Sequence, residues 1–114
     1  MGSGVLKIGK ELMKGSIPML LLSLLSRNDM YGYQMIQQMK LISKDTFELK
    51  EGTIYPILHS LENDGSVEAY WQDSADGRRR KYYRITEEGR QRLTDKRREW
   101  TAYSEAMELI LGGA

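Results

Sequence analysis

In the stretch EGTIYPILHSLENDGSVEAYWQDSADGRRRKYYRI, residues 51–85, the spacing of the apolar residues changes from the spacing typical of a helix to that typical of a strand. Residues 51–64 are predicted to form a helix that ends before Gly65, because apolar residues recur at the i, i+3, i+4, i+7 spacing of one buried face: Ile54, Ile57, Leu58 and Leu61. From residue 66 apolar and polar residues alternate, which predicts two antiparallel strands at 67–72 and 81–85. An Asp-Gly pair within 73–77 predicts the hairpin turn that joins them.

Two further helices precede this stretch. Apolar residues at helical spacing predict helices over residues 17–27 and 31–43, and Ser16 is a good N-cap for the first of them. A partial apolar face predicts a short helix over residues 5–14. Residues 46–49 are too few for a helix and predict a small strand.

The chain closes with a long helix, predicted over residues 87–111 and capped by Thr86. Apolar residues recur along it at heptad-like positions, although Lys96 interrupts the pattern: Leu93, Trp100, Tyr103, Met107 and Ile110. Such a stripe predicts a helix–helix interface, and we expect it to hold two copies of the chain together as a homodimer.

The order of these elements predicts a mainly α (α+β) fold, the winged helix-turn-helix with a two-stranded β wing and a long C-terminal dimerisation helix. We expect one compact domain, in which residues 1–86 form the DNA-binding region with the N-terminal helix and residues 87–114 form the dimerisation helix. In this fold the third helix enters the major groove of duplex DNA.

Composition excludes several other classes of protein. The 114 residues carry a net charge of +1 and no cysteine, so a disulfide or a thiolate nucleophile does not exist. His59 is the only histidine, and the acids form no spaced cluster, so we expect no enzyme, no metal and no cofactor. The longest apolar run, residues 17–25, is far shorter than a membrane span, and we expect a cytoplasmic protein of a bacterium or archaeon with no membrane partner.

Four consecutive cations, residues 78–81, follow the predicted hairpin turn. Such a run is often only a solvated surface, but on a ribbon that follows three helices it favours contact with DNA phosphates. Alternation along the strand places Arg80 and Tyr82 on one face and Lys81 and Tyr83 on the other.

The residues at the start of the third helix are also of the types that contact phosphates. Gly52 allows close approach of the backbone, and Thr53 and Tyr55 supply hydroxyls beside the helix N-terminal amides. Lys50 stands where a capping Ser or Asp is expected, and a DNA phosphate would explain a cation there. The alternative is that Gly52 only begins the helix and that Tyr55 is a core aromatic.

These observations give a set of candidate DNA-binding residues. Those expected near base edges are Thr53, His59, Ser60 and Asn63. Those expected at phosphates or in the minor groove are Lys14, Tyr33, Lys50, Tyr55, Arg78, Arg79 and Arg80.

Five motifs in order resemble the PadR family of transcriptional regulators: Lys14-Gly15, Met30-Tyr31-Gly32-Tyr33, EGTIYPIL at 51–58, GRRRKYY at 77–83, and Thr86-Glu87-Glu88-Gly89. The resemblance runs from about residue 14 to residue 111 and is closest to the shorter subgroup. It implies a winged-helix dimer that binds double-stranded DNA, usually as a repressor, at an inverted-repeat operator. It also implies, for some members, release by a small planar aromatic or phenolic ligand.

Two alternatives stay open at this point. By the resemblance, Trp100 occupies a position that lines the effector pocket in drug-binding relatives, yet a tryptophan on such a stripe more often only packs in an interface. The whole chain could instead be a protein–protein adaptor that retains the winged helix for partner binding. Salt-sensitive DNA binding distinguishes a regulator from an adaptor.

Overall fold

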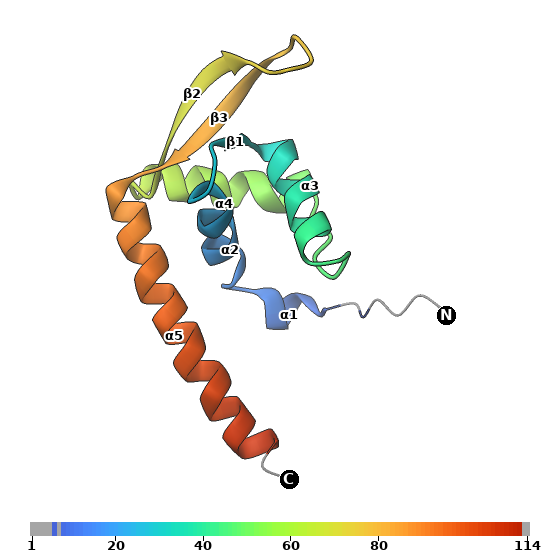
Figure 1. The fold of residues 1–114 in the computed structure, drawn as a ribbon, viewed down its shortest axis with the longest axis vertical. Coiled ribbons are helices and arrows are strands. Elements are labelled where there is room, and N and C mark those ends of the chain that lie inside the picture. The colour runs from blue at the N-terminus through green and yellow to red at the C-terminus, as the bar shows by residue number, and fades with distance from the viewer. Residues whose placement is uncertain (1–5, 7, 113–114) are drawn as a thin grey trace.

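The computed structural model describes residues 6 and 8–112 (Figure 1). Its elements, in order, are α1 (Lys10–Met13), α2 (Ile17–Leu25), β1 (Met30–Tyr31), α3 (Gly32–Ile42), α4 (Glu51–Asn63), β2 (Val67–Asp73), β3 (Arg79–Ile85) and α5 (Glu87–Leu111). In Figure 1, α2, α3 and α4 form the body, the β2–β3 hairpin projects above it, and α5 runs down and away from the base of the hairpin. This is the predicted winged-helix fold.

The sheet has three strands in the order β1-β3-β2, all antiparallel. The β2–β3 hairpin, here called the wing, pairs from Val67↔Ile85 at its base to Asp73↔Arg79 near its tip. The sequence did not predict β1, which pairs Met30 with Tyr83 and Tyr31 with Tyr82. Two residues are too few to show a period, and the partner strand lies far along the chain.

The core lies where the helices meet the base of the sheet. Its side chains come from all three helices of the body, from the strands and from the first turns of α5; the most deeply buried are Leu21, Leu25, Met35, Ile54 and Leu58. On α4 the buried residues are Ile54, Leu58 and Leu61, so the apolar face predicted for this helix is confirmed, with Ile57 partly buried beside it.

Three local predictions are wrong. Residues 46–49 form no strand; Phe47 and Leu49 instead pack against the core, and the Phe47 amide donates to Ser43 Oγ at 2.8 Å. Ser16 precedes α2 but its side chain makes no cap, because its backbone is already helical. Within the described residues the first helix covers only Lys10–Met13, while residues 5 and 7 of its predicted range lie outside them.

The caps at the junction of α4, β2 and α5 are as predicted. Gly65 has a φ of +82°, and two bonds close α4: the Ser66 amide donates to the Leu61 carbonyl at 2.9 Å and the Gly65 amide to the Glu62 carbonyl at 3.2 Å. Thr86 Oγ1 accepts from the Gly89 amide at 3.0 Å and so caps α5.

The same junction holds α5 against the end of α4. Thr86 Oγ1 donates to the Gly65 carbonyl at 2.6 Å, and Arg92 Nη1 donates to the carbonyl and side chain of Asp64 at 2.6 and 2.9 Å. The direction in which α5 leaves the body is therefore set by the end of α4. In the described part of the chain, no helix is both long and apolar enough to cross a membrane.

Candidate nucleic-acid interface

The face of α4 opposite the core is exposed and polar. Thr53, His59, Ser60 and Asn63 are all exposed, as predicted, and all project from this one helix. They offer hydroxyl, imidazole and amide groups, which donate and accept the hydrogen bonds that base edges require. The structure thus brings the four predicted base-contacting residues together on one surface.

The start of α4 is open to solvent. Lys50 is the N-cap in an extended conformation, is exposed, and makes no side-chain cap. A Cβ added at Gly52 would have no atom within 4 Å, so the backbone can be approached there. The first backbone amides of a helix lack partners within the helix, and they favour an anion.

Tyr55 has a packing role as well as an exposed surface. Its ring lies against Gly32, the first residue of α3, where an added Cβ would be 2.6 Å from Tyr55 Oη. The side chain is 41% exposed, and burial is the main cause of its raised pKa. This contact brings the starts of α3 and α4 together, and with them the exposed Tyr33. Lys14, at the end of α1, is exposed, and its side chain makes no hydrogen bond or ion pair with these residues.

The tip of the wing is organised by one carboxylate. Asp76 accepts hydrogen bonds from Ser74 Oγ, from the Arg78 amide at 3.0 Å and from Arg80 Nη2 at 2.9 Å. These bonds stabilise the ionised carboxylate and hold the pKa of Asp76 well below its usual range, with the Ser74 bond contributing most. Gly77, with a φ of +86°, makes the turn possible.

This arrangement separates the three arginines of the wing. Arg80 is paired with Asp76, and its guanidinium carbon lies 4.5 Å from the centroid of the Tyr31 ring. Arg78 and Arg79 are exposed and form no ion pair with any residue that the structure describes. Of the predicted phosphate contacts on the wing, these two are available to a ligand, whereas Arg80 is occupied within the protein.

The outer face of the sheet, which turns away from the core, carries a row of aromatic rings that the sequence analysis missed. Tyr82 packs edge-on against Tyr31 (centroids 5.3 Å apart) and stacks on Tyr70 (5.7 Å). Arg84 lies over Tyr70, whose hydroxyl donates to Asp29 at 2.5 Å. The alternation of β3 placed Arg80 and Tyr82 on one face, but their partners on β1 could not be seen without the strand pairing.

The predicted dimer residues divide into two groups. Leu93 is only 7% exposed and packs in the core of its own chain, so our expectation that it forms the dimer interface is not supported by its position. The other four are exposed along one side of α5, and we call them the α5 stripe: Trp100, Tyr103, Met107 and Ile110. By helical spacing the stripe continues the side on which Leu93 packs against the body.

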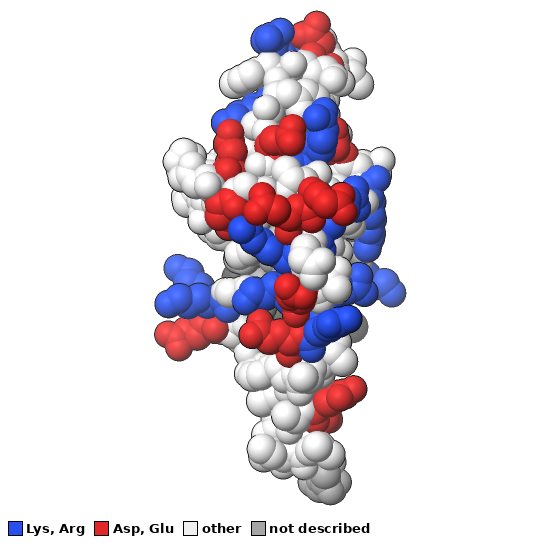
Figure 2. Space-filling view, turned by 90° about the vertical axis from the view of Figure 1, so that its left-hand side faces the viewer, with Lys and Arg blue, Asp and Glu red and all other residues white. Residues whose placement is uncertain are grey.

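Figure 2 shows the molecule from the side on which α5 begins. Acidic side chains form a band across the middle of this view, with basic ones below them, and the lower end, where α5 projects beyond the body, is mostly uncharged. A face with mixed charge does not favour a polyanion. Its uncharged end does suit the packing of another apolar surface.

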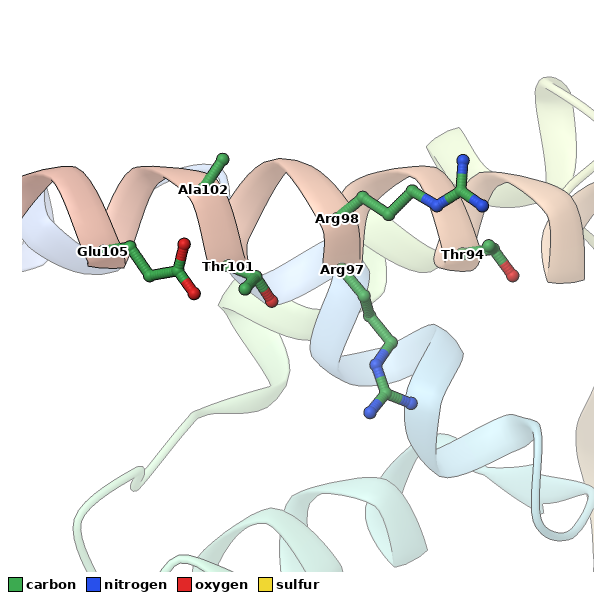
Figure 3. A pocket seen from close by; sticks show the side chains of 6 residues that line it. All are labelled: Thr94, Arg97, Arg98, Thr101, Ala102 and Glu105. Atoms are coloured by element: carbon green, nitrogen blue, oxygen red, sulfur yellow. The ribbon is translucent and has the colours of Figure 1, made fainter.

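A shallow, open hollow runs along α5, and all six residues that line it come from this helix: Thr94, Arg97, Arg98, Thr101, Ala102 and Glu105 (Figure 3). Helical spacing places them on a different side of α5 from the stripe, and Trp100 is not among them. Because a single helix lines it, the hollow cannot enclose a ligand within one protomer.

Comparison with known proteins gives consistent matches. The Transcriptional regulator PadR-like family matches residues 21–95. A transcriptional regulator from Mycobacterium tuberculosis is 34% identical over 104 residues, 91% of either chain. Among solved structures, a transcriptional regulator from Clostridium thermocellum has a TM-score of 0.83 at 28% identity, covering 90% of this chain and 99% of that chain. A PadR family transcription regulator from Clostridium difficile has a TM-score of 0.74 at 35% identity, covering 85% and 99%.

Proposed function

Because this chain belongs to the PadR-like family of transcriptional regulators, whose members are not enzymes, we propose that it represses transcription by binding an inverted-repeat operator as a homodimer. The observation that carries the proposal is which arginines of the wing form an ion pair within the protein and which do not. Arg80 and Asp76 fix the tip, while Arg78 and Arg79 beside it have no ion pair in the described chain. Cations held ready on a protruding ribbon can replace the counterions of DNA phosphates.

The exposed face of α4 supplies the second part of the interface. We place α4 in the major groove, with Thr53, His59 and Asn63 toward base edges. The amides at its start and Lys50 would then meet the backbone strand that borders the groove. Arg78 and Arg79 would contact phosphates or the minor groove next to the major groove that α4 enters.

The α5 stripe supports the homodimer. Four large apolar side chains exposed on one side of a helix lose contact with water when two such helices pair. Trp100, at 53% exposed, and Ile110, at 85%, would gain most. Since α5 is fixed to the end of α4 through Arg92 and Thr86, pairing of two α5 helices also fixes the separation of the two α4 helices. Half-sites one helical turn apart, about 34 Å, would match such a dimer.

We further propose that a small ligand releases the protein from DNA and that this ligand binds between the two α5 helices. A small planar aromatic or phenolic compound would lie against Trp100 and its partner copy, and it would release DNA if it bound the DNA-free arrangement of the dimer more tightly. Quenching of Trp100 emission by such a compound, lost in Trp100→Phe, tests this step separately from DNA binding.

Nuclease footprinting on the DNA upstream of the protein's own coding region tests the operator. We expect two protected stretches whose centres lie about one helical turn apart and whose sequences are inverted copies. A duplex that keeps only one copy should bind far more weakly than the intact duplex. Uniform protection at all positions, or equal affinity for the half-site, would contradict binding of an inverted repeat by a dimer.

A further inference from the structure

Trp71 is a large aromatic residue that neither the core nor the proposed interface has yet accounted for. It lies on β2 directly opposite Lys81 of β3, on the face of the sheet that also carries Val67, Ala69 and Tyr83. Those residues cover the core, but Trp71 lies further out along the wing and is 57% exposed. Its indole therefore presents a flat apolar surface to solvent on the inner face of the wing.

The inner face of the wing is turned toward α4. Lys81 Nζ is 3.4 Å from Glu62 Oε1 of α4 and 5.6 Å from the centroid of the Tyr83 ring. His59 comes three residues before Glu62, so the two are neighbours on one side of α4. Of the two, His59 is closer to the solvent-exposed face. Lys81 therefore joins the inner face of the wing to α4, and Trp71, its cross-strand partner, lies on that same face.

The side chains around Trp71 carry both signs of charge, because Glu62 pairs with Lys81 and Asp73 lies on the same face of β2, but one cation among them has no ion pair with any residue that the structure describes. Lys81 is its cross-strand partner, and Arg79 is the next residue on the same face of β3, within diagonal reach of an indole. Arg79 and its neighbour Arg78 have no ion pair in the described residues. A flat apolar ring beside one such cation, Arg79, matches a sugar–phosphate strand, in which an apolar sugar alternates with an anion.

We propose that Trp71 is a DNA-contacting residue, whose indole packs on the deoxyribose of the backbone strand that runs between the wing and α4 while Arg79 neutralises the adjacent phosphate. The inference rests on the proposed DNA-binding function and adds a contact that is independent of base sequence. An indole carries no charge and releases no counterion, so its contribution does not depend on salt. This separates its contribution from that of the arginines.

Fluorescence gives the direct test, because the chain has only two tryptophans. In Trp100→Phe the single tryptophan is Trp71, and a labelled duplex reports binding independently through its anisotropy. We expect the Trp71 emission to change in step with the anisotropy, and acrylamide to quench Trp71 less in the complex than in the free protein.

The outcomes are distinguishable. A duplex that binds while the emission and quenching of Trp71 stay unchanged would overturn this inference and leave the proposed function intact. Absence of any binding by anisotropy, in the parent protein as well as in Trp100→Phe, would overturn the proposed function and the inference together. Protection of Trp71 from acrylamide in the DNA-free protein, rising with protein concentration, would assign this face to a contact between copies of the chain instead.

Substitution gives a second test. Trp71→Ala should weaken binding to operator and scrambled DNA alike, by about tenfold, with the dependence of log K on log salt unchanged. Trp71→Phe should recover part of the loss because a ring remains. Leu41→Ala, at an exposed apolar residue of α3, is the matched control and should bind as the parent does. Loss of affinity for the operator alone, or a lower salt slope in Trp71→Ala, would contradict a sugar contact.

Discussion

The guanidinium carbon of Arg80 lies 4.5 Å from the centroid of the Tyr31 ring, and Nη2 of the same side chain is 2.9 Å from Asp76 Oδ2. Arg80 thus connects the tip of the wing to β1, the strand that leads into α3. Beyond the pairing of β1 with Tyr82 the wing is a two-stranded ribbon, and such a ribbon is marginally stable by itself in water. The orientation of Arg78 and Arg79 therefore depends on a residue that is itself occupied within the protein.

We predict that Arg79→Ala weakens binding to every duplex and lowers the slope of log K against log salt by about one. The reason is the loss of one cation that has no ion pair in the described chain. Arg90→Ala, the same change in charge on the exposed surface of α5, is the control and should leave the slope unchanged. An unchanged slope for Arg79→Ala would remove Arg79 from the interface.

Arg80 is predicted to act by positioning the wing rather than through its charge. Arg80→Lys retains the charge but loses the planar group over Tyr31, so it should weaken DNA binding nearly as much as Arg80→Ala. Both variants should also speed amide hydrogen exchange in residues 73–80. Full recovery of affinity in Arg80→Lys, with exchange rates like those of the parent, would show that only the charge matters.

The pH dependence of wing stability follows from Asp76. Its pKa lies below the ordinary value of 3.8, so the ionised carboxylate contributes stability above that value, and the contribution is lost as pH falls toward the lowered pKa. We predict that Asp76→Asn is less stable than the parent to urea at pH 7, and that the two converge when the pH is lowered well below 3.8. A difference that is equal at pH 7 and in acid would mean that the ionised form has no special role.

Two glycines, each in the first turn of a helix, should respond oppositely to alanine. A Cβ at Gly89 would lie 2.1 Å from the Ser66 carbonyl oxygen, so Gly89→Ala should destabilise the fold by about 1–3 kcal/mol. Gly52 has open space, so Gly52→Ala should stabilise it by about 0.5–1 kcal/mol. If a phosphate approaches the backbone at Gly52, the same variant should bind DNA more weakly despite its stability. Urea unfolding and DNA titration of both variants provide the check.

Two substitutions distinguish the role of the α5 stripe in the dimer from the role of the core in the fold. Ile110→Ser changes a side chain that is 85% exposed, so it should weaken the dimer in analytical ultracentrifugation while leaving the protomer folded. Leu93→Ala should instead lower the free energy of unfolding by about 2–5 kcal/mol, because Leu93 is buried in its own protomer. A dimer that is unaffected by Ile110→Ser at low concentration would place the interface elsewhere.

The features predicted correctly from sequence are those that a local pattern determines. The buried face of α4, the cap of α5 at Thr86 and the turn at Gly77 each depend on residues close together in the chain. Alternation along β3 also separated the buried Tyr83 from Tyr82 on the opposite face. These signals were sufficient for the winged-helix fold and for the exposed polar face of α4.

The features that were missed depend on contacts between distant parts of the chain. β1 exists because Tyr31 pairs with Tyr82, and this pairing is also what places Arg80 over the Tyr31 ring. Leu93 occupies a heptad-like position, but the body covers the first turns of α5 and converts an expected interface residue into a core residue. Trp71 fits the alternation of apolar residues along β2, so the pattern alone places it with the core residues of that strand. Only the exposure of its side chain in the folded protein shows that Trp71 lies outside the core.

Titration of the purified protein with the duplex upstream of its own coding region and with a scrambled duplex, at two salt concentrations, tests the central claim most directly. We predict tighter binding to the upstream duplex, and for both duplexes an affinity that falls steeply as salt rises, because cations such as Arg78 and Arg79 release counterions from the phosphates. Absence of binding to either duplex at the lower salt concentration would contradict the account and favour a protein–protein adaptor built on the same fold.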